Sequence, residues 1–312
     1  MISYVGNGPY CYANSAAMLL ESGGESVEPR VIEVLSGVGL GAIWVADSQT
    51  LFLSGLASAP DVGLSRSFRL LGFRVVEEAE SDGVAIPIDA LELQLDNGPV
   101  LLGPLDMGEL PYRPNASGAN GADHFVLALD IEDGAVVVHD PAGYPAMPLG
   151  VEALDRAWRA DLIAYRRGTY RRWHSPIRVE RPGPMQIAEA AIDSFSRAYR
   201  ESRAMCEPGT VVGPEAIKAL AAAIKRRELL DPGLEHLRRF ALPLGVRRAL
   251  DYSWYLSDFN PMLADLKSRQ AWHLTRAHAA ACQISWEPLA EHLMHLADLE
   301  HGVETALLEE AS

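Results

Sequence analysis

The sequence predicts an α+β amino-terminal domain, in which a helix packs on an antiparallel sheet, followed by an all-helical domain. A Gly/Pro turn opens a helix-compatible run at residues 11–20. Apolar runs of strand length follow between residues 100 and 141, and an Asp-Gly turn joins the last two. Beyond residue 185 apolar side chains recur at helical spacing. These three observations place a helix, a sheet and a group of helices in that order along the chain.

The 312-residue chain is long enough to form two domains. A Pro-rich stretch at 181–184 is typical of a linker, so we expect an α+β domain at 1–178 and a helical domain at 185–308. Besides the first helix, helices are expected at 31–35, 65–71, 86–95, 151–160, 187–199, 214–224, 233–241, 245–258, 260–283 and 286–302, strands at 73–76, 100–106, 124–131 and 135–141, and a strand or arm at 164–173.

Composition narrows the class of protein. The formal net charge is −15, which argues against nucleic acid as a partner. No apolar run has membrane-spanning length and no signal sequence opens the chain, so we expect a cytoplasmic protein without a membrane partner. The three cysteines lack CxxC spacing, and neither the Gly-rich segment at 36–41 nor the histidines complete a phosphate-binding, cofactor or metal motif. No metal and no cofactor are therefore expected.

Cys11 lies where the Gly/Pro turn becomes a helix. The unpaired N–H groups and the positive dipole end of a helix start favour a thiolate, which is the nucleophilic form. The sequence therefore predicts a low thiol pKa and a nucleophilic role for Cys11. A small buried structural cysteine is the alternative.

His124 opens one strand of the expected hairpin and Asp140 ends the other. The two ends are neighbours in a tight hairpin, so a carboxylate there can hold the imidazole in one tautomer. If the helix of Cys11 packs on this sheet, the three residues supply a nucleophile, a base and an orienting group. Two alternatives remain: His124 can cap a strand, and Asp140 with Pro141 can simply form a turn.

These motifs resemble the papain-like fold of the C39-type peptidases. The hairpin reads HFVLALDIEDGAVVVHDP, and the Cys-bearing helix precedes it. The segments GVGLG and GPVLLGPLDMGELPY and the helical tail RRALDYSWYLSDFNPMLADL resemble more closely the BtrH-like family of butirosin biosynthesis. The resemblance implies a cysteine acyltransferase that passes an acyl group from an acyl-carrier-protein thioester, or another thioester donor, to a small amine. It also implies Cys11 as nucleophile, His124 as base and Asp140 as orienter.

One departure concerns the oxyanion hole. Papain-like enzymes usually place a Gln shortly before the nucleophile, and residues 1–10 contain none. Asn7 is the nearest amide, and we expect it to donate to the oxyanion together with the backbone N–H of Cys11; the alternative is a weaker oxyanion hole.

Further candidate site residues flank these motifs. Tyr10, Asp106 and Tyr112 are expected to bind substrate, although a strand-end turn also explains Asp106 and Tyr112. Arg166 and Arg167 belong to a basic stretch that follows the Asp140 strand, and we expect them to dock an acidic carrier protein. Pairing with surface carboxylates is the alternative for these arginines.

Three functions stay open at this point. The first is acyl transfer to an amine through an acyl-Cys11 intermediate. The second is hydrolysis of a peptide, amide or thioester, and the third is a non-catalytic binding module with the same fold. The acyl group, the acceptor and the oligomeric state do not follow from the sequence.

Overall fold

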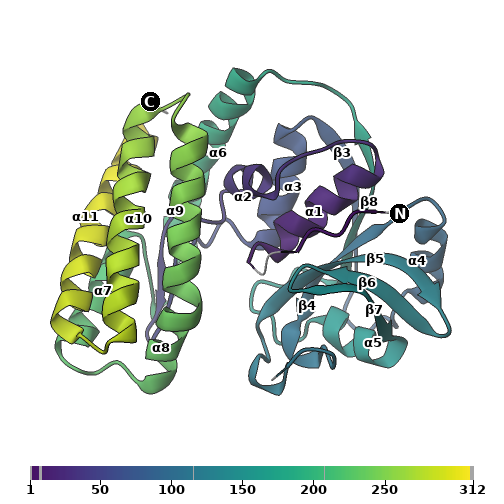
Figure 1. Cartoon of the computed structure of the whole chain (residues 1–312), viewed down its shortest axis with the longest axis horizontal. Coiled ribbons are helices and arrows are strands. Elements are labelled where there is room, and N and C mark those ends of the chain that lie inside the picture. Colours follow the sequence, from purple (N-terminus) through teal and green to yellow (C-terminus); the bar gives the residue numbers. More distant parts are fainter. Residues whose placement is uncertain (1, 7–8, 115, 207, 310–312) are drawn as a thin grey trace. The chain divides into compact units, whose positions relative to one another are not determined.

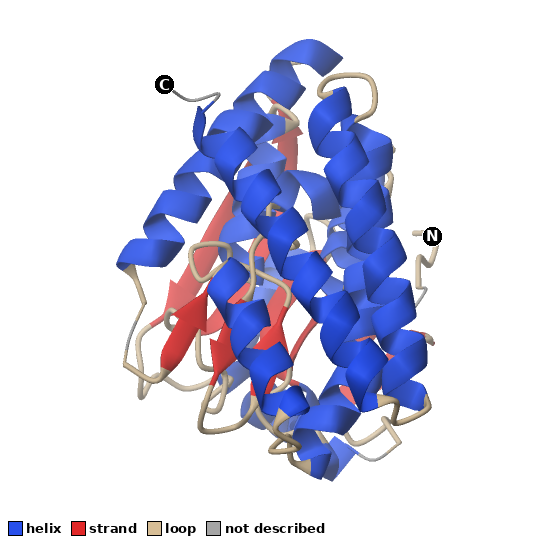
Figure 2. Cartoon of the chain, turned by 90° about the vertical axis from the view of Figure 1, so that its left-hand side faces the viewer, coloured by secondary structure: helices blue, strands red, loops and turns tan. Residues whose placement is uncertain are grey.

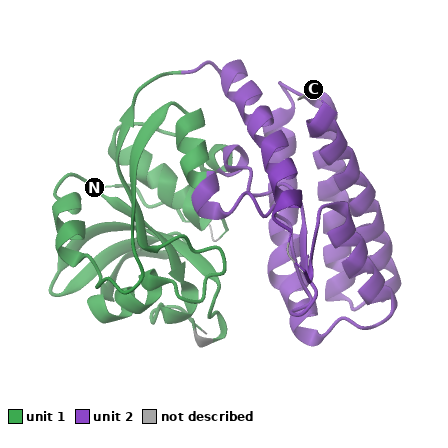
Figure 3. Cartoon of the chain, turned by 180° about the vertical axis from the view of Figure 1, so that it is seen from behind, with its two compact units in different colours: residues 1–32, 64–181 green, residues 33–63, 182–312 purple. Residues whose placement is uncertain are grey.

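The computed structural model describes residues 2–6, 9–114, 116–206 and 208–309 (Figure 1). The chain forms two compact units, coloured separately in Figure 3. The boundary after residue 181 falls within the expected linker, but residues 33–63, which the sequence places in the first domain, group with the helices. We call the two the amino-terminal unit (Met1–Ile32 and Leu64–Arg181) and the helical unit (Glu33–Gly63 and Pro182–Ser312).

The amino-terminal unit contains a six-stranded antiparallel sheet in the order β3-β8-β4-β5-β6-β7. This organisation confirms the α+β class and the antiparallel sheet. The strands are β3 (Phe73–Glu80), β4 (Val100–Asp106), β5 (Asp123–Glu132), β6 (Ala135–Asp140), β7 (Tyr144–Gly150) and β8 (Thr169–Arg178).

The β5–β6 hairpin follows directly from local sequence. Asp133 and Gly134 both have positive φ angles, 50° and 78°, as a two-residue type I′ turn requires. Pairing of Leu127 with His139 then fixes the register that brings the start of β5 close to the end of β6.

Helices cover both faces of this sheet (Figure 1). Helix α1 packs mainly on β5, while α4 and α5 share a core with the opposite face. Small side chains such as Ala13 and Ala16 are fully buried and let α1 approach the strand closely. The helices are α1 (Cys11–Ser22), α4 (Ile88–Leu95) and α5 (Val151–Arg159), with 3-10 turns at Met107–Glu109 and Ala116–Gly118.

The chain passes between the units within α2 (Pro29–Ser36) and α3 (Pro60–Leu70). In the helical unit, α10 packs on α9 and α11, and α11 also packs on α6 and α7. Figure 2 shows long helices of the chain lying side by side. The helices are α6 (Pro184–Ala204), α7 (Pro214–Lys225), α8 (Asp231–His236), a π-helical segment (Leu237–Ala241), α9 (Leu242–Leu256), α10 (Pro261–Cys282) and α11 (Trp286–Glu309). None of the described helices combines the length and apolar character needed to cross a membrane.

A small second sheet joins distant parts of the helical unit. Its strands, in the order β2-β1-β9, are β1 (Ile43–Val45), β2 (Thr50–Phe52) and β9 (Thr210–Val212). The Gly-rich segment that precedes β1 packs on α9. A Cβ at Gly39 would lie 2.9 Å from Arg248 Cδ and from Tyr252 Cε2.

Candidate active site

His124 and Asp140 form a buried pair at the end of the large sheet where β5 begins and β6 ends. His124 Nε2 lies 2.6 Å from Asp140 Oδ1, and both residues are at most 2% exposed. The distance requires a proton between the two atoms, so Nε2–H donates to the carboxylate. This tautomer leaves Nδ1 as the basic nitrogen of the imidazole.

Asp140 receives hydrogen bonds on both carboxylate oxygens. The backbone N–H of Ala142 donates to Oδ1 at 2.7 Å, and the hydroxyl of Tyr112 donates to Oδ2 at 3.0 Å. Burial raises the pKa of Asp140, but the hydrogen bond and charge of His124, the N–H of Ala142 and the charge of Arg113 outweigh burial and lower that pKa overall. The carboxylate is therefore held ionised.

Arg113 lies against the same pair. Its NH1 atom is 3.5 Å from Asp140 Oδ2 and 3.1 Å from His124 Nε2. Because Nε2–H already points at Asp140, the short approach to His124 brings two donors together and is not a hydrogen bond. The sequence analysis did not single out Arg113.

Cys11 begins α1, as expected, and is half-buried. Helix α1 contacts β5 at Phe125, the residue after His124, through a hydrogen bond and a ring contact. The hydroxyl of Ser15 donates to the Phe125 carbonyl at 3.3 Å, and the rings of Tyr12 and Phe125 pack edge to face with centroids 5.8 Å apart. The N–H of Phe125 lies near enough to the Cys11 sulfur to lower the pKa of the thiol, which places the nucleophile next to the start of the strand that carries His124.

The pKa of the Cys11 thiol is raised, whereas the sequence predicts a low value. Burial raises its pKa, and the carboxylates of Asp123 and Asp140 raise it further. The N–H groups of Phe125 and Tyr12 lower the pKa by less. The prediction of a low thiol pKa at the helix start is therefore wrong, because desolvation and two negative charges outweigh the helix terminus.

Tyr10 precedes the nucleophile in a left-handed conformation, with φ 68° and ψ 42°. A non-glycine residue in this region is strained, and such residues often occur at functional sites. Tyr10 is only 4% exposed, so contact of its ring with substrate stays a prediction. Asn7, the expected oxyanion donor, lies outside the described residues.

Asp106 organises the loop that carries Tyr112 and Arg113. Oδ1 accepts from the N–H of Gly108 at 2.9 Å, and both carboxylate oxygens lie 3.1 Å from the N–H of Gly121. These bonds occupy a carboxylate that is 3% exposed, and we therefore assign Asp106 to loop closure instead of substrate binding. Tyr112 lies in the site, where its hydroxyl donates to Asp140. A contact between Tyr112 and substrate stays a prediction.

Arg166 and Arg167 are paired with carboxylates of their own unit. Arg166 NH1 lies 2.8 Å from Asp82 Oδ1, and Arg167 NH2 lies 3.7 Å from Glu77 Oε1. This arrangement matches the alternative of a surface paired with its own acids. Docking of a carrier protein on these arginines stays a prediction.

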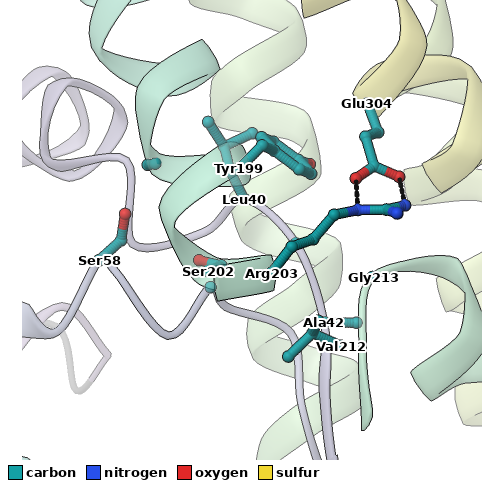
Figure 4. Close-up of a pocket in the computed structure, with 12 residues that line it drawn as sticks. Leu40, Ala42, Ser58, Tyr199, Ser202, Arg203, Val212, Gly213 and Glu304 are labelled. Atoms are coloured by element: carbon teal, nitrogen blue, oxygen red, sulfur yellow. Dashed lines mark hydrogen bonds and ion pairs between the residues drawn. The ribbon is translucent and has the colours of Figure 1, made fainter. Parts of the chain in front are cut away.

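The helical unit contains small hollows beside a buried polar network. Figure 4 shows one of them, next to the bidentate pair in which Arg203 donates to Glu304 at 2.6 and 2.8 Å. Nearby, Glu300 accepts from Tyr199 and Gln270. Among the described residues no group of three or more His, Cys, Asp or Glu side chains is arranged to hold a metal.

Asp123 is a second residue of the site that the sequence analysis did not predict. It directly precedes His124, it raises the pKa of Cys11, and its Oδ2 accepts from the hydroxyl of Tyr165 at 2.8 Å. Its position immediately before the candidate base His124 is the feature of the sequence that could have indicated this role.

Comparison with known proteins finds a relative that aligns with nearly the whole chain. The uncharacterized protein YobF of Bacillus subtilis (strain 168) is 38% identical over 308 residues, which are 99% of each chain. The family model of the YobF C-terminal domain matches residues 207–308. A crystal structure from Bacillus anthracis, described as a C39-like peptidase, covers 57% of this chain and 96% of its own with 13% identity and a TM-score of 0.38, a similarity too low to assign a fold or function. By its full-length identity with the Bacillus subtilis protein, the chain belongs to the YobF family.

Proposed function

We propose that the amino-terminal unit is a papain-like cysteine acyltransferase, related in its chemistry to the BtrH-like enzymes. The observation that carries the proposal is the buried His124–Asp140 pair at 2.6 Å, with the Cys11 sulfur near the N–H of Phe125, the residue next to that histidine. The proposal gives Cys11, His124 and Asp140 the roles of nucleophile, base and orienting carboxylate that other cysteine and serine acyl-transfer enzymes use.

In the proposed first half-reaction, His124 Nδ1 removes the thiol proton as the Cys11 sulfur attacks the thioester carbonyl. The tetrahedral intermediate then expels the donor thiolate, which takes the proton from the imidazolium. The products are an acyl-Cys11 thioester and a free thiol. Asp140 keeps Nε2 protonated throughout and stabilises the imidazolium.

In the second half-reaction an amine attacks acyl-Cys11 and passes a proton to His124. The intermediate collapses, the amide leaves, and the proton returns to the Cys11 sulfur. The backbone N–H of Cys11 is the proposed main-chain donor to the oxyanion in both steps. Asn7 remains the proposed side-chain donor.

Two features support a thioester as the donor. The raised pKa of Cys11 keeps the resting residue a thiol, so the attack depends on proton removal by His124. The segment before Cys11 has no Gln for the oxyanion. Where Asn7 does not replace that Gln in full, the loss of one oxyanion donor costs about 10²–10³ in rate, which an activated acyl donor tolerates better than an amide does.

The partition of an acyl thioester between amide and acid tests this proposal. Acyl-N-acetylcysteamine thioesters are incubated with the enzyme and a panel of amines, and both products are quantified. We expect amide to increase with amine concentration while total turnover depends on Cys11 and His124. Free acid as the sole product across the panel would instead establish the hydrolase.

A further inference from the structure

Arg113 is held beside the His124–Asp140 pair by its loop. Its N–H donates to the carbonyl of Leu110 at 3.1 Å, and Leu110 is fully buried. Asp106 bonds Gly108 and Gly121 and so fixes both ends of the loop. The backbone position of Arg113 is therefore set by the fold, while its side chain is 18% exposed.

The guanidinium has more donors than acceptors at this position. An arginine carries several N–H donors in a planar fork. Among the described residues its only carboxylate partner is Asp140, through the 3.5 Å contact to Oδ2, an oxygen that Tyr112 already occupies at 3.0 Å. The 3.1 Å approach to His124 Nε2 brings donors together. Within the part of the chain that the structure describes, the remaining donors of Arg113 have no carboxylate acceptor.

The same contact opposes the reaction as long as Arg113 stays there. Removal of the Cys11 proton gives His124 a positive charge 3.1 Å from a guanidinium nitrogen. The other charged or titratable groups around His124 are Asp140, Asp123, Cys11 and Tyr112. An anionic acceptor that drew the guanidinium toward itself would remove this repulsion. Asp140 would then pair with His124 and no longer with Arg113.

We infer that Arg113 binds an anionic group, a carboxylate or a phosphate, on the thioester substrate. The inference rests on the proposed function and names the class of donor. Planar guanidinium forks bind both groups bidentately. The anion has two sources, a carboxylate on the acyl group or a phosphate on the thiol that carries it.

Three thioesters separate these sources. The neutral reference is glutaramoyl-N-acetylcysteamine, the acyl arm is glutaryl-N-acetylcysteamine, and the thiol arm is glutaramoyl-phosphopantetheine. We expect one anionic thioester to exceed the reference in kcat/KM by about tenfold or more, the effect of a hydrogen bond to a charged group. Arg113→Gln should remove this preference and Arg113→Lys should keep part of it. The control is Arg156→Gln, which removes an exposed arginine of α5 that pairs with Glu109 and should keep the preference.

A second readout does not depend on acyl transfer. Alkylation of Cys11 is mapped by mass spectrometry with glutarate, inorganic phosphate or neutral glutaramide present. We expect an anion, and not glutaramide, to slow alkylation of the wild-type protein and to lose this effect in Arg113→Gln. No protection of the wild type, or a preference that survives Arg113→Gln, would overturn the inference. Absence of turnover with every thioester, with anion protection intact, would instead overturn the proposed function.

Discussion

His124 Nε2 and Asp140 Oδ1 lie 2.6 Å apart, and this contact fixes which imidazole nitrogen can act as a base. Replacing Asp140 by Asn presents an amide that can donate to Nε2 and so favours the wrong tautomer. We expect Asp140→Asn to lower kcat by about 10²–10⁴ with little change in KM. Steady-state kinetics check this, and a change confined to KM would contradict the orienting role.

The lowered pKa of Asp140 also predicts how the free energy of unfolding depends on pH. Its folded pKa is lower than its unfolded value of about 3.9, so its contribution is fully present above that value and is lost as pH falls through the folded pKa. The wild type should therefore lose stability below about pH 4 more steeply than Asp140→Asn. Urea unfolding from pH 6 downward measures the difference. Parallel curves would show that the carboxylate gives no net stabilisation.

Asp123 controls the reactivity of the thiol. Because its carboxylate raises the pKa of Cys11, Asp123→Asn should increase the thiolate fraction and speed alkylation of Cys11 several-fold at pH 8. Cys206 and Cys282 are exposed, so the assay uses a Cys206→Ser/Cys282→Ser background. The matched control is Asp130→Asn, at an exposed position on the same strand. An equal effect of both substitutions would point to overall charge instead of this contact.

The buried network of the helical unit predicts a stability effect. Tyr199 donates to Glu300 Oε1 at 2.6 Å, and Glu300 is 3% exposed. Tyr199→Phe leaves that oxygen without this donor and should reduce the free energy of unfolding by about 1–3 kcal/mol. Tyr255→Phe is the control, since no hydrogen bond of Tyr255 is found within the described residues. Urea denaturation of both variants tests the difference, and equal losses would contradict it.

The parts of the fold that could be predicted depend on local sequence. The Asp133-Gly134 turn and the apolar strands on either side specify the hairpin, so the proximity of His124 and Asp140 followed without knowledge of the rest of the chain. The position of Cys11 at a helix start was equally local. The long helices of the helical unit follow from their 3.6-residue periodicity.

The remaining features depend on contacts between distant segments. Pairing of β1 with β9 joins Trp44 to Val211, and three-residue strands carry too little pattern to predict such pairing. The grouping of residues 33–63 with the helices has the same origin. The pKa of Cys11 depends on how closely α1 packs beside Asp123, and the approach of Arg113 to Asp140 depends on loop closure by Asp106.

The most direct test of the account is the mass of the intact protein after brief reaction with an acyl-N-acetylcysteamine thioester and no amine. The account predicts one added acyl group, mapped to Cys11 by peptide analysis, absent in Cys11→Ala, much slower to form in His124→Ala, and discharged on addition of an acceptor amine. Turnover that persists in Cys11→Ala, or an acyl group that maps to Cys206 or Cys282 and survives the amine, would contradict covalent catalysis by Cys11.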